Sequence, residues 1–494
     1  MASKSAIVIG SGVAGLSTAS YLGQNGYEVT IIEKHNQAGG RARQYSHEGF
    51  VFDMGPSWYW MPDVFEKFYN DFGHKASDFY ELKRLDPSYR VYDKKGKAVD
   101  IPADMTELEA LFETYEKGSS LNLRQFLKEA AYKYEVGIND LVYKPGLSLL
   151  EFADLRLLKG LMKMDVLTSM RSHVHSFIKD PFLQELLEFP ILFLGALPEN
   201  TPALYSLMNY ADMSLGTWYP MGGMHKIIEA FVSIAKEQQV KIELETEAKS
   251  IIIENGKAIG VETNKGKFLA DVVIGAGDYH HIETKLLKPE NRQYSDTYWE
   301  NRKMAPSCLL YYIGLNTKLH GMKHHNLFFD TDFGLHSHEI YTDPKWPSNP
   351  LFYASAPSVT DPSVAPEGYE NLFLLIPIAP GLGGDDEVIR EKYLDIMLKR
   401  LEERLGEKVK VHIIYKRSYS ISNFIDDYHA FKGNAYGLAN TLSQTAILKP
   451  RLRSKKVKSL YFSGQLTVPG PGVPPGIISG KVCALQILKD NKTN

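Results

Sequence analysis

A glycine-rich turn near the N-terminus has the residue types and spacing needed to hold a dinucleotide. Gly10, Gly12 and Gly15 form a GxGxxG motif, and Glu33 follows 18 residues after Gly15. Gly10 allows a tight turn, Gly12 lets a pyrophosphate approach the backbone, and Gly15 lets a helix pack closely. An acid at the position of Glu33 accepts hydrogen bonds from an adenosine ribose. A lone GxGxxG also occurs in turns without a ligand, but together with this acid it predicts a dinucleotide site.

A βαβ unit must position these residues, and the flanking sequence predicts one. Residues 6–9 and 28–32 are short apolar runs, as expected of buried parallel strands. Between them, residues 16–25 show one apolar face, and Gly26 ends the predicted helix. The free N–H groups and partial positive charge at the N-terminus of this helix suit a phosphate group.

Two later segments have the pattern of further pieces of the same domain. Residues 218–224 (WYPMGGM) precede a predicted helix over 225–237, and a hairpin with Asn255-Gly256 at its turn precedes a buried strand over 268–277. Near the C-terminus, a strand over 459–463 leads into a segment dense in glycine and proline over 464–480. Such a segment lacks side chains and N–H donors, so a flat ring could lie against it. A helix is predicted over 478–488, and its dipole would favour negative charge on a reduced ring.

Three motifs link these pieces to a known family: residues 53–58 (DMGPSW), residues 218–223 (WYPMGG) and the segment 464–480. With Gly39-Gly40-Arg41 after the second strand, they resemble the bacterial-type carotenoid desaturases. That group lies within a superfamily of FAD oxidoreductases that also contains amine oxidases and protoporphyrinogen oxidase. The resemblance extends from residue 6 to about residue 488. Relatives often carry histidine before the first proline of the C-terminal block, but this chain has Val468, so no role of that histidine is carried over.

The resemblance implies an α/β fold with a Rossmann-like FAD-binding domain built from discontinuous segments, plus a mixed α+β substrate domain. We expect residues 1–75, 216–289 and 446–494 to form the FAD-binding domain. Residues 76–215 are expected to be a helical region for substrate and membrane docking, and residues 290–445 a substrate-binding sheet. Length alone, at roughly 150 residues per domain, suggested about three domains.

The cofactor implied by the resemblance is FAD. Trp58, Tyr59 and Trp60 are predicted to line the substrate path, with core packing as the alternative. The predicted FAD-binding residues are Gly10, Gly12, Val13, Ala14, Gly15, Glu33, Lys34, Gly40, Arg41, Gly55, Pro56, Ser57, Trp58, Ala248, Gly277, Gly464, Gln465, Val473, Pro474 and Ile477.

The activity implied is desaturation of a carotenoid in carotenoid biosynthesis, by hydride transfer to the flavin and loss of a proton from the adjacent carbon. Such chemistry needs orientation rather than a nucleophile. Glu151, Asp154 and Arg156 are the candidate catalytic groups, and ordinary surface charge is their alternative. No second Rossmann motif is present, so we expect a quinone or dioxygen to reoxidise the flavin. The substrate stays open between phytoene and a 1'-hydroxycarotenoid desaturated at the 3,4 position.

Composition and local pattern narrow the remaining choices. The 494 residues are 44% hydrophobic and 23% charged, which excludes a disordered chain or a fibre. The net charge of -3 predicts no nucleic-acid partner. Cys308 and Cys483 lack the spacing of a disulfide framework or a metal site, and the histidines 324, 325, 336 and 338 are interpreted as solvated loop residues, so no metal is expected.

We expect a cytoplasmic protein that lies on the inner face of the cell membrane. The N-terminus is not a secretory signal, and no apolar run reaches the roughly 18 residues of a spanning helix. Residues 146–171 are rich in Leu and Met with interspersed Arg and Lys, a composition typical of a helix in a membrane interface as well as of an ordinary core. Together with the apolar run 189–197 they predict peripheral membrane contact.

Three other functions share this architecture. A flavin amine oxidase would have a small site with a polar mouth, and the Leu- and Met-rich segment argues against it. A carotenoid isomerase would use reduced flavin without net oxidation. An isoprenoid-binding escort protein would need no redox cofactor, and the intact glycines and Glu33 argue against it.

Overall fold

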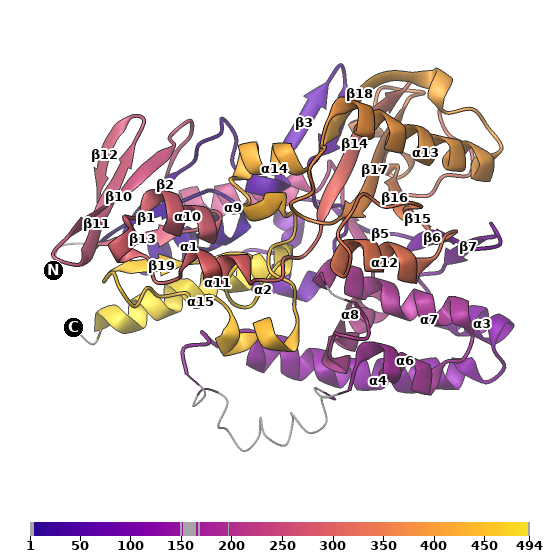
Figure 1. Ribbon diagram of the computed structural model, residues 1–494, viewed down its shortest axis with the longest axis horizontal. Helices are drawn as coiled ribbons and strands as arrows, with labels where there is room; N and C mark the ends of the chain where they lie inside the picture. Colours follow the sequence, from indigo (N-terminus) through magenta and orange to yellow (C-terminus); the bar gives the residue numbers. More distant parts are fainter. Residues whose placement is uncertain (1–3, 149–150, 152–164, 166–167, 196, 493–494) are drawn as a thin grey trace.

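The computed structural model describes residues 4–148, 151, 165, 168–195 and 197–492. Figure 1 shows a parallel sheet at one end of the molecule, a larger mixed sheet at the other, and a group of helices beneath the larger sheet. This arrangement is the predicted α/β fold with an attached α+β part.

The parallel sheet has five strands in the order β19-β13-β1-β2-β9, and all its neighbours pair in parallel. It gathers strands from the beginning, the middle and the end of the chain, which is why the segments of the nucleotide-binding fold are discontinuous. The strands are β1 (Ser5–Ile9), β2 (Glu28–Ile32), β9 (Lys241–Glu243), β13 (Val272–Gly275) and β19 (Leu460–Phe462).

Two helices pack tightly beside this sheet because small residues line their contact. Helix α1 (Val13–Gln24) is buried from Ala14 to Leu22 and crosses α15 (Val473–Lys492). A Cβ added at Gly480 would lie 2.5 Å from the Cβ of Ser17, so only glycine permits this approach. Helix α15 begins five residues earlier than the sequence pattern predicts. Pro474 and Pro475 fall in its first turn, where no backbone N–H is needed for an intrahelical bond.

The predicted hairpin forms part of a small antiparallel sheet, β10 (Ala248–Glu254), β11 (Lys257–Thr263) and β12 (Gly266–Leu269). Asn255 and Gly256 both have positive φ, at 49° and 73°. This is the backbone that a two-residue hairpin turn requires, and it accounts for the Asn-Gly pair.

The mixed sheet has seven strands in the order β18-β14-β17-β16-β15-β6-β7. Helix α13 (Glu387–Leu405) packs with Leu309, Tyr311 and Ile313 on one face, whereas Cys308 and Leu310 belong to the core on the opposite, inner face. The strands are β6 (Tyr89–Tyr92), β7 (Ala98–Ile101), β14 (Ser307–Leu315), β15 (His325–Phe328), β16 (Phe352–Ser355), β17 (Glu370–Ile378) and β18 (Ile413–Tyr419).

Residues 76–215 are less uniformly helical than the sequence suggests. Strands β6 and β7 extend the mixed sheet, and β5 (Leu82–Arg84) pairs with β8 (Trp218–Pro220). The aromatic and β-branched residues of β6 favour a strand, and Tyr89 and Val91 fill the core of the inner face. The α-helices among the described residues of this region are α3 (Met105–Tyr115), α4 (Ser119–Val136), α6 (Met170–Phe177), α7 (Pro181–Glu188) and α8 (Leu207–Asn209).

The other strands and α-helices of the described residues lie between the strands of the two sheets along the chain. They are β3 (Gln44–His47), β4 (Phe50–Asp53), α2 (Pro62–Asp71), α9 (His225–Glu237), α10 (Tyr279–Leu286), α11 (Asp296–Glu300), α12 (Phe333–Tyr341) and α14 (Ile421–Tyr428). None of the helices in the described ranges is long and apolar enough to cross a membrane.

Candidate active site

The glycine-rich turn has the backbone geometry that its spacing predicts. Gly10 has φ of +104°, a value that L side chains rarely adopt. A Cβ at Gly15 would lie 2.0 Å from the carbonyl oxygen of Gly10, so the helix can approach the turn only with glycine there. Gly12 differs from both, because a Cβ at this position would meet nothing within 4 Å. Other parts of the protein therefore pack against the turn at Gly10 and Gly15, whereas the Cβ side of Gly12 faces open space.

Glu33 is fixed beside this turn. Its Oε2 accepts hydrogen bonds from the backbone N–H of Ser11 at 2.9 Å and from the Ser11 hydroxyl at 2.7 Å. Its Oε1 accepts the backbone N–H of His35 at 3.0 Å. A carboxylate has about four acceptor positions, so these three bonds leave capacity for a ribose hydroxyl. Ser11 lies inside the glycine motif, yet its side chain was not singled out by the sequence argument.

The second glycine pair lies against the first turn. Gly12 and Gly39 form an isolated β-bridge, and a Cβ at Gly40 would lie 3.2 Å from the Cα of Gly12. A Cβ at Gly55 would lie 2.6 Å from the carbonyl oxygen of Arg41, so the segment 53–58 follows directly beside the 39–41 segment. These contacts bring together three motifs that the sequence predicts separately.

Asn434, which the sequence argument missed, joins Arg41 to the C-terminal loop. The Nη2 of Arg41 donates to the Asn434 carbonyl oxygen at 3.3 Å, and the Nε2 of Gln465 donates to the Asn434 Oδ1 at 3.1 Å. The Nε of Arg41 is buried and has no hydrogen-bond partner among the described residues. A buried guanidinium with a free N–H is suited to an anionic group.

Asp53 is a second residue without a predicted role. Its carboxylate accepts the backbone N–H groups of Met224 at 2.7 Å and His225 at 3.0 Å, which attaches the 218–224 motif to the 53–58 motif. Burial raises the pKa of Asp53 to about 7. The acidic residue in the DMGPSW motif could have indicated such a contact, but only the fold shows that its partners are the backbone N–H groups of the 218–224 motif and of His225.

The other predicted FAD-binding residues surround the same turn or lie along its continuation. A Cβ at Gly464 would come no closer than 3.9 Å to Ala14, and one at Gly476, next to Ile477, would lie 3.3 Å from Val13. Gly277 is exposed at the end of β13. Ala248 opens β10 two residues after Thr246, whose N–H donates to the carbonyl oxygen of Glu33. The Nζ of Lys34 donates to the carbonyl oxygen of Asp426 at 2.7 Å.

This set of groups fits FAD. The open side of Gly12 at the N-terminus of α1 suits a pyrophosphate, Glu33 suits a ribose, and Arg41 can offset phosphate charge. When bound, FAD supplies a two-electron acceptor; the protein's residues hold and orient it.

The three predicted substrate-lining residues divide between two sides of their segment. Trp58 and Trp60 have ring centroids 5.2 Å apart, and Trp58 also lies 5.5 Å from Tyr89. Tyr59 is turned to the opposite side, where it stacks on Phe65 at 4.2 Å and is fully buried. The geometry therefore groups Trp58 and Trp60 in one aromatic cluster and places Tyr59 in core packing.

Of the candidate catalytic groups, only Glu151 lies within the described residues; Asp154 and Arg156 lie outside them. The Glu151 carboxylate accepts backbone N–H groups of Gly146 at 2.9 Å, Leu147 at 3.0 Å and Ser148 at 3.1 Å. These bonds make it a local cap of its own loop. The Cβ position of Gly146 is 3.1 Å from Val468, so this loop lies against the C-terminal block.

The interpretation of the four histidines as solvated loop residues is wrong, because three are buried and the fourth, His338, lies on α12. His325 belongs to strand β15 and is fully buried, His324 immediately precedes that strand, and His336 belongs to α12. Their apolar neighbours come from strands distant in sequence, so local sequence could not reveal their burial. Only His338 is exposed.

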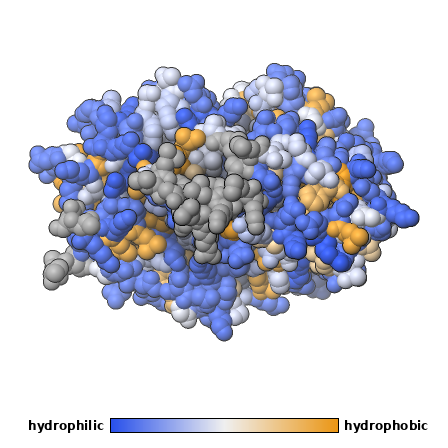
Figure 2. All heavy atoms as spheres, turned by 90° about the horizontal axis from the view of Figure 1, so that it is seen from below, coloured by the Kyte–Doolittle hydropathy of each residue, from blue (hydrophilic) through white to orange (hydrophobic). Residues whose placement is uncertain are grey.

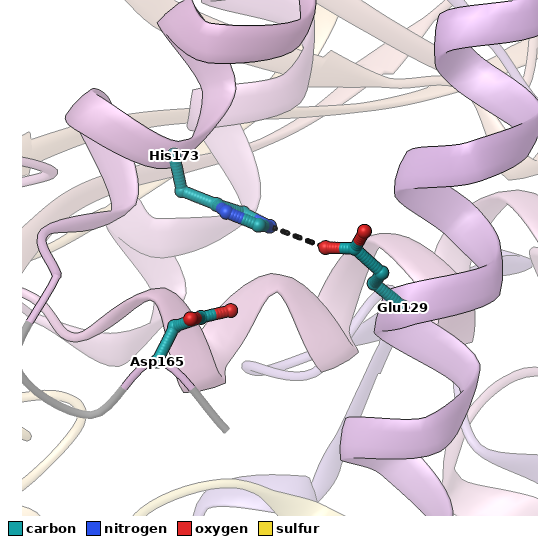
Figure 3. A group of neighbouring side chains, drawn as sticks. All are labelled: Glu129, Asp165 and His173. Atoms are coloured by element: carbon teal, nitrogen blue, oxygen red, sulfur yellow. Dashed lines mark ion pairs between the residues drawn. The ribbon is translucent and has the colours of Figure 1, made fainter. Parts of the chain in front are cut away.

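Glu129, Asp165 and His173 form one group of potential metal ligands, with their ligand atoms within 4.8 Å of one another (Figure 3). The Nζ of Lys133 lies 3.0 Å from the Asp165 carboxylate and 3.2 Å from the Nε2 of His173. Lys133 is 1% exposed, so its ammonium already supplies a buried positive charge to this group. The arrangement is an ion-pair cluster that ties Asp165 to α4.

Comparison with known proteins places this site in a family. The profile of the flavin containing amine oxidoreductases matches residues 13–488. The chain is 40% identical over 485 residues to a carotenoid 3,4-desaturase of Haloarcula japonica, covering 98% of both chains. It is 30% identical over 496 residues to a 4,4'-diapophytoene desaturase of Staphylococcus aureus, again covering 98% of both.

Solved structures agree on the fold. An oxidoreductase from Methanosarcina mazei matches with a TM-score of 0.62 and 18% identity, covering 98% of this chain and 100% of that one. A putrescine oxidase bound to putrescine matches with a TM-score of 0.61 and 13% identity, covering 99% of both chains. The family match and the desaturase relatives show that the protein is an FAD-dependent oxidoreductase. The chain belongs to the flavin-containing amine oxidoreductase family and, within it, to the carotenoid desaturases.

Proposed function

We propose that the protein is an FAD-dependent carotenoid desaturase of carotenoid biosynthesis that acts at a 3,4 carbon–carbon bond. The observation that carries this proposal is the 40% identity, over 98% of both chains, to a carotenoid 3,4-desaturase. In the reaction two hydrogens leave neighbouring carbons and a conjugated double bond forms. The two electrons pass to FAD, and a quinone or dioxygen takes them up in turn.

The residues that would hold FAD are those around the open side of Gly12, with Glu33 for the ribose and Arg41 for the phosphates. The cluster of Trp58 and Trp60 supports an apolar substrate path, because aromatic faces pack well against a polyene. Desaturation then depends on which bond is held over the flavin, and positioning is the main task of the protein.

We also propose that the protein is cytoplasmic and lies on the inner face of the membrane, where a carotenoid dissolves. The side of the molecule that carries α4 is shown in Figure 2, with apolar residues exposed among polar ones. Leu121 on α4 is 67% exposed, and Leu448 and Leu485 are each 50% exposed. Exposed apolar side chains of this kind support contact with lipid.

The test is incubation of the FAD-loaded protein with carotenoids in liposomes, under air or with an added quinone. We expect a product two hydrogens lighter by mass spectrometry, with absorption shifted to longer wavelength. Protein stripped of FAD is the control and should give no product. Release of hydrogen peroxide from amines, with no change in any carotenoid, would refute the proposal.

A further inference from the structure

A buried histidine lies on the inner face of the mixed sheet, within the aromatic cluster. His325 is fully buried in β15, and its ring stacks on Trp58 with centroids 4.1 Å apart and planes at 13°. Trp58 in turn lies 6.3 Å from Phe189 and 5.5 Å from Tyr89. An imidazole is therefore surrounded by the same aromatic rings that support the substrate path.

One ring nitrogen of His325 has a hydrogen-bond partner, and the other has none among the described residues. Its Nδ1 lies 2.6 Å from the hydroxyl oxygen of Tyr353, on the neighbouring strand β16. Its Nε2 is buried and has no hydrogen-bond partner among the residues that the structure describes. Buried polar atoms in proteins are nearly always paired, so an orphan of this kind marks a place for a ligand or a water.

The bond to Tyr353 determines which nitrogen carries the proton. Tyr353 lies on strand β16, where Ser355 pairs with His325 of β15. A phenol O–H is a stronger hydrogen-bond donor than a neutral imidazole N–H, and an imidazole nitrogen is a stronger acceptor than a phenol oxygen, so the Tyr353 O–H donates to Nδ1 of His325. The proton of a neutral imidazole then resides on Nε2.

The ring is neutral because burial, reinforced by neighbouring His324, lowers the pKa of His325 well below its ordinary value. A neutral N–H in apolar surroundings favours a neutral oxygen acceptor. An anion would find no compensating charge in this ring, and a hydrocarbon offers no acceptor.

We propose that His325, positioned by Tyr353, is a specificity-determining residue whose Nε2–H donates a hydrogen bond to an oxygen substituent of the carotenoid. This inference rests on the proposed function and names the residue that would recognise a hydroxyl or keto oxygen at one end of the substrate. Its selectivity arises because a pure hydrocarbon leaves the Nε2–H unpaired in the complex.

The experiment uses the FAD-loaded protein and three carotenoids of the same carbon skeleton: a hydrocarbon, its hydroxylated form and its keto form. Dissociation constants are measured by quenching of tryptophan fluorescence, and kcat and KM are measured separately. We expect the wild type to bind an oxygenated carotenoid roughly 10- to 100-fold more tightly than the hydrocarbon. The hydroxyl and keto arms show which oxygen is preferred.

Three variants isolate the donor. His325→Leu should lose the preference for an oxygenated carotenoid over the hydrocarbon. His325→Gln, whose side-chain N–H can lie near the position of Nε2, should restore part of the preference. Tyr353→Phe should weaken it, because the bond that fixes the proton on Nε2 is removed. FAD content and the thermal unfolding midpoint of each holoenzyme identify variants that are merely misfolded.

The outcomes separate this inference from the proposed function. A wild type that binds all three carotenoids equally, or a His325→Leu variant that keeps the preference, would overturn the role of His325 and leave a buried water as the occupant. An equal loss of affinity for all three carotenoids in that variant would also overturn it. Absence of any new double bond refutes the desaturase proposal, whereas the binding preference still decides the role of His325.

Discussion

The contrast between Gly12 and Gly15 gives a sharp test of where the cofactor binds. Both are changed to alanine, which adds one methyl group at each position. The methyl of Gly15→Ala would lie 2.0 Å from the carbonyl oxygen of Gly10 and 3.2 Å from the Cβ of Ala276, so the backbone must shift. Overpacking of this kind costs about 1–3 kcal/mol, and we expect that loss in the protein without FAD.

Gly12→Ala should behave in the opposite way. Gly12 has φ of -68° and ψ of 176°, which alanine adopts without strain, and the methyl group meets nothing within 4 Å. The FAD-free protein should keep its stability or gain about 0.4–1 kcal/mol from the stiffer unfolded chain. FAD affinity should nevertheless fall by about 10- to 100-fold, because the methyl group occupies the space proposed for the pyrophosphate. The displaced pyrophosphate then loses one charge-assisted hydrogen bond to the protein.

Chemical unfolding with and without FAD measures both effects. At an FAD concentration about 100 times the wild-type Kd, binding should stabilise the wild type by about 2.7 kcal/mol. A variant that binds about 100-fold more weakly should gain only about 0.4 kcal/mol. If Gly12→Ala gains as much as the wild type, the pyrophosphate does not approach Gly12 and the proposed cofactor position is wrong.

Three further predictions concern buried polar groups. Burial raises the pKa of Asp212 to about 6, so the folded state holds this proton more tightly than the unfolded state. As the pH rises from about 4 to about 7, the wild type should lose up to about 3 kcal/mol of stability relative to Asp212→Asn. Parallel curves of stability against pH for the two proteins would contradict this. Burial raises the pKa of Cys308 to about 12 and also raises that of Cys483, so neither thiol should react with a thiol reagent until the protein unfolds. Fast labelling of the native protein would contradict this by showing that one of the thiols is accessible. Asp165→Asn should cost about 1–2 kcal/mol of stability, because the buried charge of Lys133 then lacks its partner carboxylate, whereas Lys133→Met should leave the stability nearly unchanged. Added zinc should leave the thermal unfolding midpoint of the wild type unchanged, and a rise would mean that a metal displaces the ammonium.

The nucleotide-binding unit is predictable from sequence because its signals are local. Gly10 reports a backbone that L side chains rarely adopt, Gly15 reports a close approach of helix and turn, and Glu33 follows at a distance determined by one helix and one strand. The Asn255-Gly256 turn is readable for the same reason, since two adjacent residues specify its geometry. Resemblance of three motifs then extended this reading to FAD and to the carotenoid desaturases.

The strands β6 and β7 show where local pattern stops. Each has only four residues. Strand β6 pairs with β15, more than two hundred residues later in the chain, and β7 pairs with β6. A pattern this short does not distinguish a strand from a turn of helix. The expectation of a helical region over 76–215 failed there for this reason.

The sequence alone determines the glycine-rich βαβ unit and the family that the motifs resemble, and it predicts that the turn faces a phosphate and that Glu33 faces a ribose. The tertiary structure alone shows that Asn434 joins Arg41 to Gln465 and that Tyr59 turns away from Trp58. It also shows that His325 is buried with one ring nitrogen unpaired among the described residues. Backbone conformation depends mainly on neighbouring residues in the sequence, whereas burial and pairing depend on side chains that the fold brings together from distant segments. The sequence of this protein therefore predicts a cofactor site, whereas the groups that we propose to select its substrate come together only in the fold.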